Sequence, residues 1–452
     1  MYVMIASVAG LAAVVGDFGL SYAAIQVKSL NNAERSNLFW LNVVLGLTGT
    51  LCFLALSPML ASFYGSENLT PIAAVMSVVF LFNGLTVQHR AELTRRMRFL
   101  SLTAADISSQ LAGLACAIAL ALGGWGIWAL VCQQLVSLGM VLVFSWFMAG
   151  WMPGLPNFRV GLGRFLRFGG HTFGGSLINY ISSNADNVVL GRYASAADVG
   201  IYGRMYQLFS LPMQQLAAPL TRVALPILAS LNEAPERYLA FLKRAQLCLA
   251  YVFVFTFTVL AVAAPGVVKL VLGDGWEGGT AVLQMLAIGG IFQGLGYVYY
   301  WIFLSRARMD IQFRLGLVSR AIMVGAIVLC GPLGMYWVAA AAAGGLALNW
   351  TIYTIWGVPR ADVDIRALLV VAIRPALVFI PFATVGVLYG AQMETMLGPI
   401  LFTASAVGSA VVYLLVIASI ATPVRRDCLT IFRTAALAIR RSPSLSDQGL
   451  KG

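Results

Sequence analysis

Long apolar runs follow one another from the start of the chain almost to its end. Each has 18 or more residues, which is enough for an α-helix to cross the hydrocarbon core of a bilayer. Breaker residues such as Gly123-Gly124 and Gly331-Pro332 separate the runs. The pattern predicts an all-α polytopic membrane protein. We expect thirteen spans, near residues 2–26, 37–62, 70–89, 103–123, 126–148, 166–192, 199–224, 246–272, 279–305, 313–333, 335–357, 366–390 and 396–421.

Composition supports the membrane class. Hydrophobic residues make up 60% of the chain and charged residues only 10%, whereas charged residues form about 25% of a typical soluble domain. The net charge of +12 would be compatible with nucleic-acid binding, but the basic residues are dispersed among the loops between spans. The six cysteines are scattered without metal-ligand or redox-motif spacing, so we interpret them as small hydrophobic residues. We expect no nucleic-acid partner, metal or cofactor.

Charge alternates from loop to loop. The loops after every odd-numbered span carry nearly all the lysines and arginines, whereas the other loops carry acids such as Glu67, Asp274 and Glu394. Because basic loops face the cytoplasm, this alternation supports the thirteen spans and places Met1 outside. The expected location is the bacterial inner (plasma) membrane, with the chain crossing it many times.

An internal repeat divides the chain. Residues 58–130 resemble residues 265–338 in their order of breakers, basic loop and aromatics, and residues 1–21 resemble residues 201–221. The first copy has no counterpart of the span at 166–192, so we expect one further transmembrane helix upstream of Met1. The predicted architecture has two parallel six-helix lobes and two extra helices. Its parts are an N-terminal lobe (1–150), a C-terminal lobe (151–360), two extra spans (361–425) and a cytoplasmic tail (426–452).

Polar side chains at membrane depth gather on two consecutive predicted spans, 166–192 and 199–224. Such side chains are costly in hydrocarbon and usually face a bundle interior or a water-filled path. We therefore expect these two spans to line a cavity. The first span carries Asn179, Ser182, Ser183, Asn184, Asp186 and Asn187, and the second carries Arg204, Gln207, Gln214 and Gln215.

Single charges at depth are open to two interpretations. Asp17, between Gly16 and Gly19, either breaks its helix or couples transport to a cation. Asp186 lies six residues before Arg192, which is the wrong helical spacing for a direct pair. A pair between Asp186 and Arg204 on the next span is the alternative, and it would be either structural or part of a transport site. Arg204, one turn from Gln207, is difficult to explain by packing and is the strongest candidate for function.

Other candidates have a plainer interpretation. His89 and His171 lie near cytoplasmic span ends and are more typical of interfacial residues than of metal ligands. The basic run from Arg90 to Arg98 is first a topology signal and second a candidate phosphate contact at a cytoplasmic mouth.

Five segments carry a resemblance to a known family. They are GDFGLSYAAIQ (16–26), LFWLNVVLG (38–46), FYG (63–65), NGLTVQHRAELTRRMRF (83–99) and DNVVLGRYASAADVGIYGRMYQL (186–208). They resemble the Wzx-type oligosaccharide-lipid flippases of the multidrug/oligosaccharidyl-lipid/polysaccharide exporter superfamily. The likeness covers essentially the whole chain.

The resemblance implies that the chain moves a polyprenyl-pyrophosphate-linked oligosaccharide, such as an O-antigen or exopolysaccharide repeat unit, to the outer leaflet by alternating access. Arg204 and Arg192 would then bind phosphate, because guanidinium pairs bidentately with it. Asparagines and glutamines on 179–215 would bind sugar. Membrane lipids and the polysaccharide polymerase and export machinery would be partners. The alternatives are a cation-coupled multidrug exporter of the same superfamily and a membrane glycan polymerase or ligase, although no paired carboxylates are placed for acid–base work.

Overall fold

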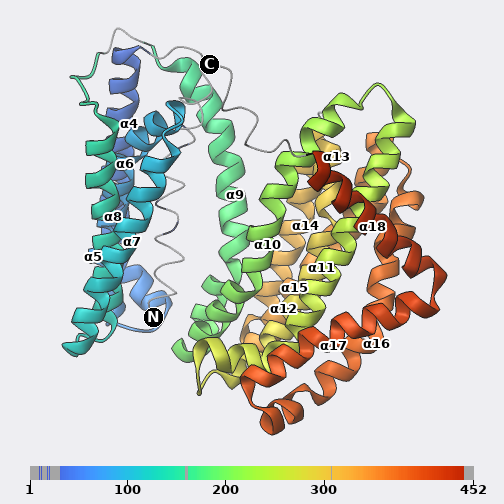
Figure 1. Cartoon of the computed structure of the whole chain (residues 1–452). Coiled ribbons are helices and arrows are strands. Elements are labelled where there is room, and N and C mark those ends of the chain that lie inside the picture. Colours follow the sequence, from blue (N-terminus) through green and yellow to red (C-terminus); the bar gives the residue numbers. More distant parts are fainter. Residues whose placement is uncertain are drawn as a thin grey trace, which may run out of the picture. The chain divides into compact units, whose positions relative to one another are not determined.

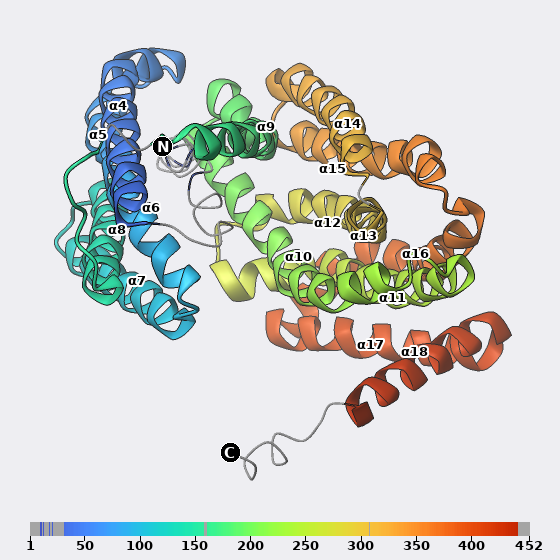
Figure 2. The ribbon, with the colours of Figure 1, turned by 90° about the horizontal axis from the view of Figure 1, so that it is seen from above.

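The computed structural model describes residues 10, 12, 18, 20, 31–157, 161–306 and 308–441. Contacts between residues divide the chain into two compact units, Met1–Gly200 and Ile201–Gly452. Within the described residues the secondary structure is helical (Figures 1 and 2). This is expected in lipid, because a helix satisfies its own backbone hydrogen bonds. The all-α polytopic fold is thus confirmed, whereas the predicted lobe boundary after residue 150 stays a prediction.

Unit 1 is built around the packing of four long helices. Helix α4 packs on α6, α6 on α8, and α7 on α8. A capping box begins α4, in which Asn31 and Glu34 each accept a hydrogen bond from the other's backbone N–H. The helices of this unit are α4 (Asn32–Phe63), α5 (Leu69–Met76), α6 (Val78–Arg95), α7 (Phe99–Leu122), α8 (Ile127–Ala149) and α9 (Gly163–Tyr193).

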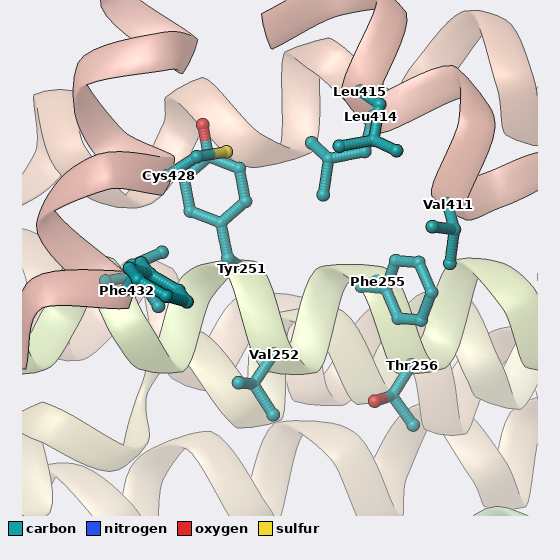
Figure 3. A pocket seen from close by; sticks show the side chains of 10 residues that line it. Tyr251, Val252, Phe255, Thr256, Val411, Leu414, Leu415, Cys428 and Phe432 are labelled. Carbon is teal, nitrogen blue, oxygen red and sulfur yellow. The ribbon is translucent and has the colours of Figure 1, made fainter. Parts of the chain in front are cut away.

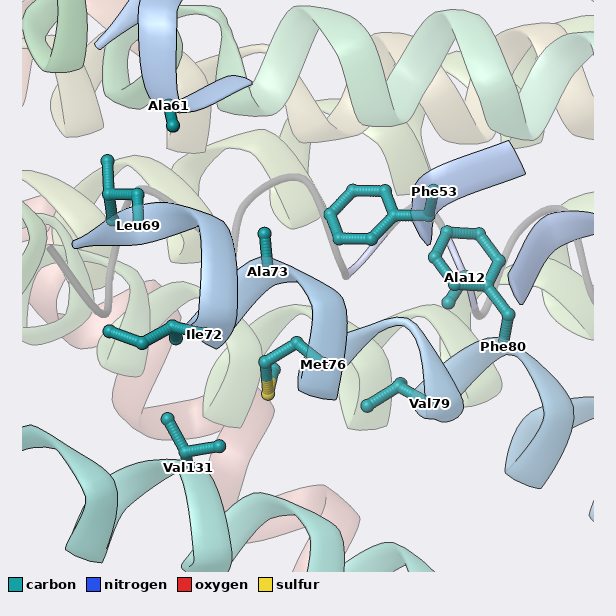
Figure 4. Packing of buried hydrophobic residues seen from close by; sticks show 10 residues of the cluster. All are labelled: Ala12, Phe53, Ala61, Leu69, Ile72, Ala73, Met76, Val79, Phe80 and Val131. Carbon is teal, nitrogen blue, oxygen red and sulfur yellow. The ribbon is translucent and has the colours of Figure 1, made fainter. Parts of the chain in front are cut away.

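The core of unit 1 forms where α4, α5, α6 and α8 meet. Phe53 of α4 lies beside Phe80 of α6 with ring centroids 5.4 Å apart. Val131 of α8 and Met76 of α5 are buried in the same cluster (Figure 4). The helices approach closely because α4 and α6 carry glycine where they cross. In the most apolar part of α4 only 17% of the residues are buried in the protein.

Unit 2 is organised around α11, which packs on α12, α16 and α17. Its most apolar stretch is 67% buried, against 17% for α17, so α11 is the core helix and α17 a peripheral one. Pro235 occupies its first position, where a missing N–H is tolerated. The helices are α10 (Ala196–Ser230, begun in unit 1), α11 (Pro235–Leu272), η1 (Glu277–Gly279), α12 (Thr280–Leu295), α13 (Tyr297–Ser305), α14 (Met309–Cys330), η2 (Gly331–Leu333), α15 (Met335–Ile352), η3 (Tyr353–Gly357), η4 (Val358–Ala361), α16 (Ile365–Leu397), α17 (Pro399–Ile420) and α18 (Thr422–Arg441).

Ten helical segments of the described chain are long and apolar enough to cross a membrane, and they coincide with ten of the thirteen predicted spans. The prediction at 2–26 falls almost wholly outside the described residues. The predictions at 166–192 and 199–224 coincide with α9 and α10, which have the required length but are not among the ten apolar segments. That α9 and α10 cross the membrane therefore stays a prediction.

The predicted tail begins in a helix. Residues 426–441 belong to α18, which starts at Thr422. The remainder, 442–452, lies outside the described residues. Sequence reasoning placed no helix here, because α18 is too polar to be a span.

Candidate functional site

Helix α10 has two unlike faces within unit 2. Tyr202, Met205, Phe209 and Met213 are at most 7% exposed. They follow one another at intervals of three and four residues, so they form one buried stripe along the helix. This stripe anchors α10 in the unit and fixes which residues point the other way.

The opposite face of α10 carries an exposed polar stripe, formed by Arg204, Gln207, Gln214 and Gln215. From Arg204 to Gln215 the stripe extends about 16 Å at 1.5 Å per residue. The Arg204 guanidinium donates a hydrogen bond of 2.9 Å to the amide oxygen of Gln207, which uses one of its five N–H groups. The structure thus brings two of the predicted site residues, Arg204 and Gln207, into contact, and Gln214 lies further along the same face.

Helix α9 carries the other predicted polar set, in unit 1. Asp186 and Asn187 are buried, at 4% and 8% exposure. The Asp186 carboxylate accepts a hydrogen bond of 2.8 Å from the Asn187 backbone, and the amide oxygen of Asn187 is buried without a partner among the described residues. Asn184 donates to the Tyr180 carbonyl of the preceding turn at 3.0 Å. Asn179 is exposed.

The predicted charged residues of the cavity lie in different parts of the chain. Asp186 belongs to unit 1 and Arg204 to unit 2, so the predicted pair between them stays a prediction. The Arg192 guanidinium is exposed and lies 5.9 Å from the ring of Phe63. Asp17 falls outside the described residues.

The two arginines predicted at a cytoplasmic mouth contact protein groups. Arg90 of α6 forms two hydrogen bonds to the Asp106 carboxylate of α7, at 2.6 and 3.1 Å. Arg98 donates to the Met148 carbonyl at 2.7 Å, where a cation is favoured by the C-terminal end of α8. These contacts hold unit 1 together, and a phosphate contact for either arginine stays a prediction.

A buried ionic cluster at the end of α6 was missed by sequence reasoning. The Glu92 carboxylate pairs with Arg35 of α4 at 2.9 Å and with Arg96, the residue that follows α6, at 2.7 Å. Glu92 is only 7% exposed. The isolated acid within a basic run was a visible signal. Its partner Arg35, however, is 57 positions earlier in the chain, and only packing of α4 on α6 pairs them.

His89, near the end of α6, is enclosed by protein side chains, and its position at the membrane interface stays a prediction. It is fully buried because its ring stacks on Trp146 at 4.7 Å and meets Phe39 edge-on at 5.6 Å. Aromatic partners from α4 and α8 therefore enclose it. Among the described residues, no group of three or more His, Cys, Asp or Glu side chains could hold a metal ion.

The chain matches a known protein family. A helix with one buried apolar face and one exposed polar face, such as α10, is typical of membrane transporters when it belongs to a polytopic all-α fold. A family model described as "Polysaccharide biosynthesis protein" matches residues 1–281. This match covers more than half of the 452 residues, and the chain belongs to this family.

Relatives of known name support the same family. The chain is 27% identical over 355 residues to "Lipopolysaccharide biosynthesis protein WzxC" of Escherichia coli (strain K12), covering 76% of this chain and 69% of the relative. It is 28% identical over 310 residues to "Teichuronic acid biosynthesis protein TuaB" of Bacillus subtilis (strain 168), covering 67% and 63%. The match therefore spans about two thirds of each relative's length.

A solved structure shares the fold. The chain resembles the lipid II flippase MurJ in an inward closed conformation, with a TM-score of 0.66 and 12% identity over 92% of each chain. At this identity the likeness shows the fold alone. It confirms the polytopic helical architecture that the sequence predicts.

Proposed function

We propose that this protein flips a lipid-linked oligosaccharide across the plasma membrane by alternating access. The observation that carries the proposal is the exposed polar stripe on α10, Arg204 with Gln207, Gln214 and Gln215. Polar groups on a membrane-length helix favour a water-filled path over lipid. Membership of a polysaccharide biosynthesis family favours a glycan as cargo.

The chemistry of the stripe suits a pyrophosphate-linked glycan. Arg204 supplies a planar cation that pairs with phosphate oxygens, and Gln207 orients it through their 2.9 Å hydrogen bond. The amides of Gln214 and Gln215, further along the stripe, both donate and accept hydrogen bonds, as sugar hydroxyls require. For Asn179, Asn184, Asp186 and Arg192 of α9 we propose contacts with the transported glycan-lipid, and for Asp17 or Asp186 coupling of transport to a cation.

The family match also bears on the alternatives. A polysaccharide biosynthesis family favours a glycan-lipid cargo over a drug. The fold shared with a lipid II flippase favours a transporter over an enzyme that forms or breaks glycosidic bonds. We propose that the polysaccharide polymerase and export machinery receive the flipped product.

The experiment compares complementation of a strain that lacks the gene. Surface polysaccharide should fall in the deletion strain, and the complete lipid-linked repeat unit should accumulate in the cytoplasmic leaflet. Arg204→Ala should lower restored polysaccharide about 10- to 100-fold, because a hydrogen bond to a charged group contributes about 1.5–3 kcal/mol. Arg204→Lys should restore an intermediate level, since lysine keeps the charge but not the bidentate geometry.

Arg314→Ala is the matched control, because Arg314 is an exposed arginine of unit 2 outside the stripe. It should complement fully, and all variants should reach the membrane in equal amounts. Normal polysaccharide with Arg204→Ala would remove the phosphate role of Arg204. Unchanged polysaccharide in the deletion strain, with altered sensitivity to cationic drugs, would favour the multidrug exporter instead.

A further inference from the structure

An apolar groove of about 530 Å³ lies at the C-terminal end of unit 2. Helix α11 contributes Val252 and Phe255, α17 contributes Leu414, and α18 contributes Cys428 and Phe432 (Figure 3). The volume is in the range that holds a small ligand, about 300–1,000 Å³. Two of the three walls are membrane-spanning helices, so the medium beside the groove is lipid.

The third wall, α18, is fixed in place by a buried carboxylate. Asp427 is 7% exposed, and both of its oxygens accept from Arg374 of α16 at 2.8 Å. The Tyr251 hydroxyl of α11 donates to the same carboxylate at 3.2 Å. Val424 is buried on the same side of α18, against Leu247 and Tyr251. The groove is therefore built by tertiary contacts and does not depend on a loose terminal helix.

The exposed surface of α18 carries both basic and apolar side chains. Arg425 and Arg426 are exposed, and so is Phe432, at 73%. Over its whole length α18 has five arginines and one acid, Asp427, and that acid already pairs with Arg374. A helix of this composition lies in the membrane interface and attracts anionic lipid.

Helical geometry places Arg425 next to the groove. Arg425 precedes Cys428 by three residues and Phe432 by seven, and residues at these intervals share one helix face. Cys428 and Phe432 both line the groove. Burial raises the pKa of the Cys428 thiol, and the neighbouring Asp427 carboxylate raises it further, so the thiol stays neutral and the wall uncharged.

We propose that the groove binds an acyl chain of one anionic phospholipid, whose phosphate is held by Arg425 and attracted by the positive charge of the neighbouring Arg426. The apolar walls of α11, α17 and α18 suit a hydrocarbon chain and offer it no cation or carboxylate. The arginines suit a negative headgroup. The bound lipid joins α18 to the spans and forms a site separate from the polar stripe on α10.

The experiment measures lipid retention by the full-length protein. The protein is purified in detergent and mixed with phosphatidylglycerol or phosphatidylcholine, and retained lipid is counted by native mass spectrometry. One phosphatidylglycerol should be retained, with at least tenfold preference over phosphatidylcholine. The double variant Arg425→Gln/Arg426→Gln should abolish the preference. Val252→Trp, which fills the groove, should lower retention of both lipids at least tenfold.

The control variant removes two positive charges away from the groove. Arg237→Gln/Arg314→Gln neutralises two exposed arginines of unit 2 that do not line the groove, and it should retain phosphatidylglycerol as the unchanged protein does. Equal elution on gel filtration shows that each variant is folded. Equal retention of both lipids, or retention unaffected by Val252→Trp, would overturn the proposal. Displacement of phosphatidylglycerol by an equimolar polyprenyl phosphate would also overturn it and assign the groove to a prenyl chain.

Discussion

At the scale of single residues, Glu92 pairs with Arg35, which would otherwise be a largely buried charge without compensation. Its second partner, Arg96, is 45% exposed. Arg35 is 12% exposed and Glu92 9% at their side chains. A buried ion pair is not necessarily worth more than an apolar contact, but removing one partner leaves the other without compensation. The Arg35 guanidinium also lies 4.3 Å from the centre of the Trp151 ring. If Arg35 lost its carboxylate partner, its side chain could reach solvent only by breaking this contact.

Glu92→Gln should therefore destabilise the protein by about 3 kcal/mol, the lower end of the cost of breaking a buried pair. Thermal unfolding of the purified protein in detergent measures this loss. The matched control is Asp106→Asn, whose partner Arg90 is 34% exposed and whose own side chain is 48% exposed. Because exposed pairs contribute at most about 1 kcal/mol, the control should change unfolding little. Equal effects of the two variants would contradict the buried-charge explanation.

At the scale of helices, glycine decides how closely α4 and α6 pack. A Cβ atom added to Gly46 of α4 would lie 2.7 Å from the Phe80 backbone oxygen of α6. Real Cβ atoms do not come this close, and a backbone oxygen within a helix cannot turn away. The two helices would have to separate.

Gly46→Ala should cost about 1–3 kcal/mol, the range for overpacking a core, although alanine by itself favours a helix by about 0.5–1 kcal/mol. Gly139→Ala in α8 is the control, because its added Cβ would meet the Phe82 ring at an ordinary 3.7 Å. It should leave stability unchanged or raise it slightly. Unfolding temperature and the yield of monodisperse protein distinguish the two, and a stable Gly46→Ala protein would show that the crossing can relax.

At the scale of the whole molecule, α9 and α10 decide the number of spans. Both are long enough to cross, with 31 and 35 residues, yet neither is among the apolar segments that qualify by hydropathy. Polar faces lower their mean hydropathy, as expected for helices that line a water-filled path. The alternation of basic loops nevertheless predicts that both helices cross.

Cysteine labelling tests this directly in a cysteine-free background. Cysteines are placed singly at three exposed positions, Leu155, Ala197 and Glu233, which precede α9, follow it and follow α10. A membrane-impermeant maleimide should label whole cells at position 197 only, and positions 155 and 233 only after permeabilisation. Labelling of all three from the same side would show that neither helix crosses, and it would remove the proposed polar path.

Much of the fold could be predicted from the sequence. Ten predicted spans coincide with helices of sufficient length and apolarity, because hydropathy is a local sum that needs no knowledge of neighbours. The polar stripe on α10 was also visible as residue types. That these polar residues lie on the exposed face of α10 could not be predicted, since it depends on how Tyr202 and Phe209 pack.

The remaining features depended on contacts between distant segments. The sequence determined the membrane class, the helical spans and the residues able to bind phosphate and sugar, because each follows from local composition and spacing. The tertiary structure decided that Glu92 pairs with Arg35, that His89 is buried, and that Asp427 holds α18 against α11 and α16. These partners lie tens to hundreds of residues apart, and only the packing of helices brings their side chains within hydrogen-bonding distance.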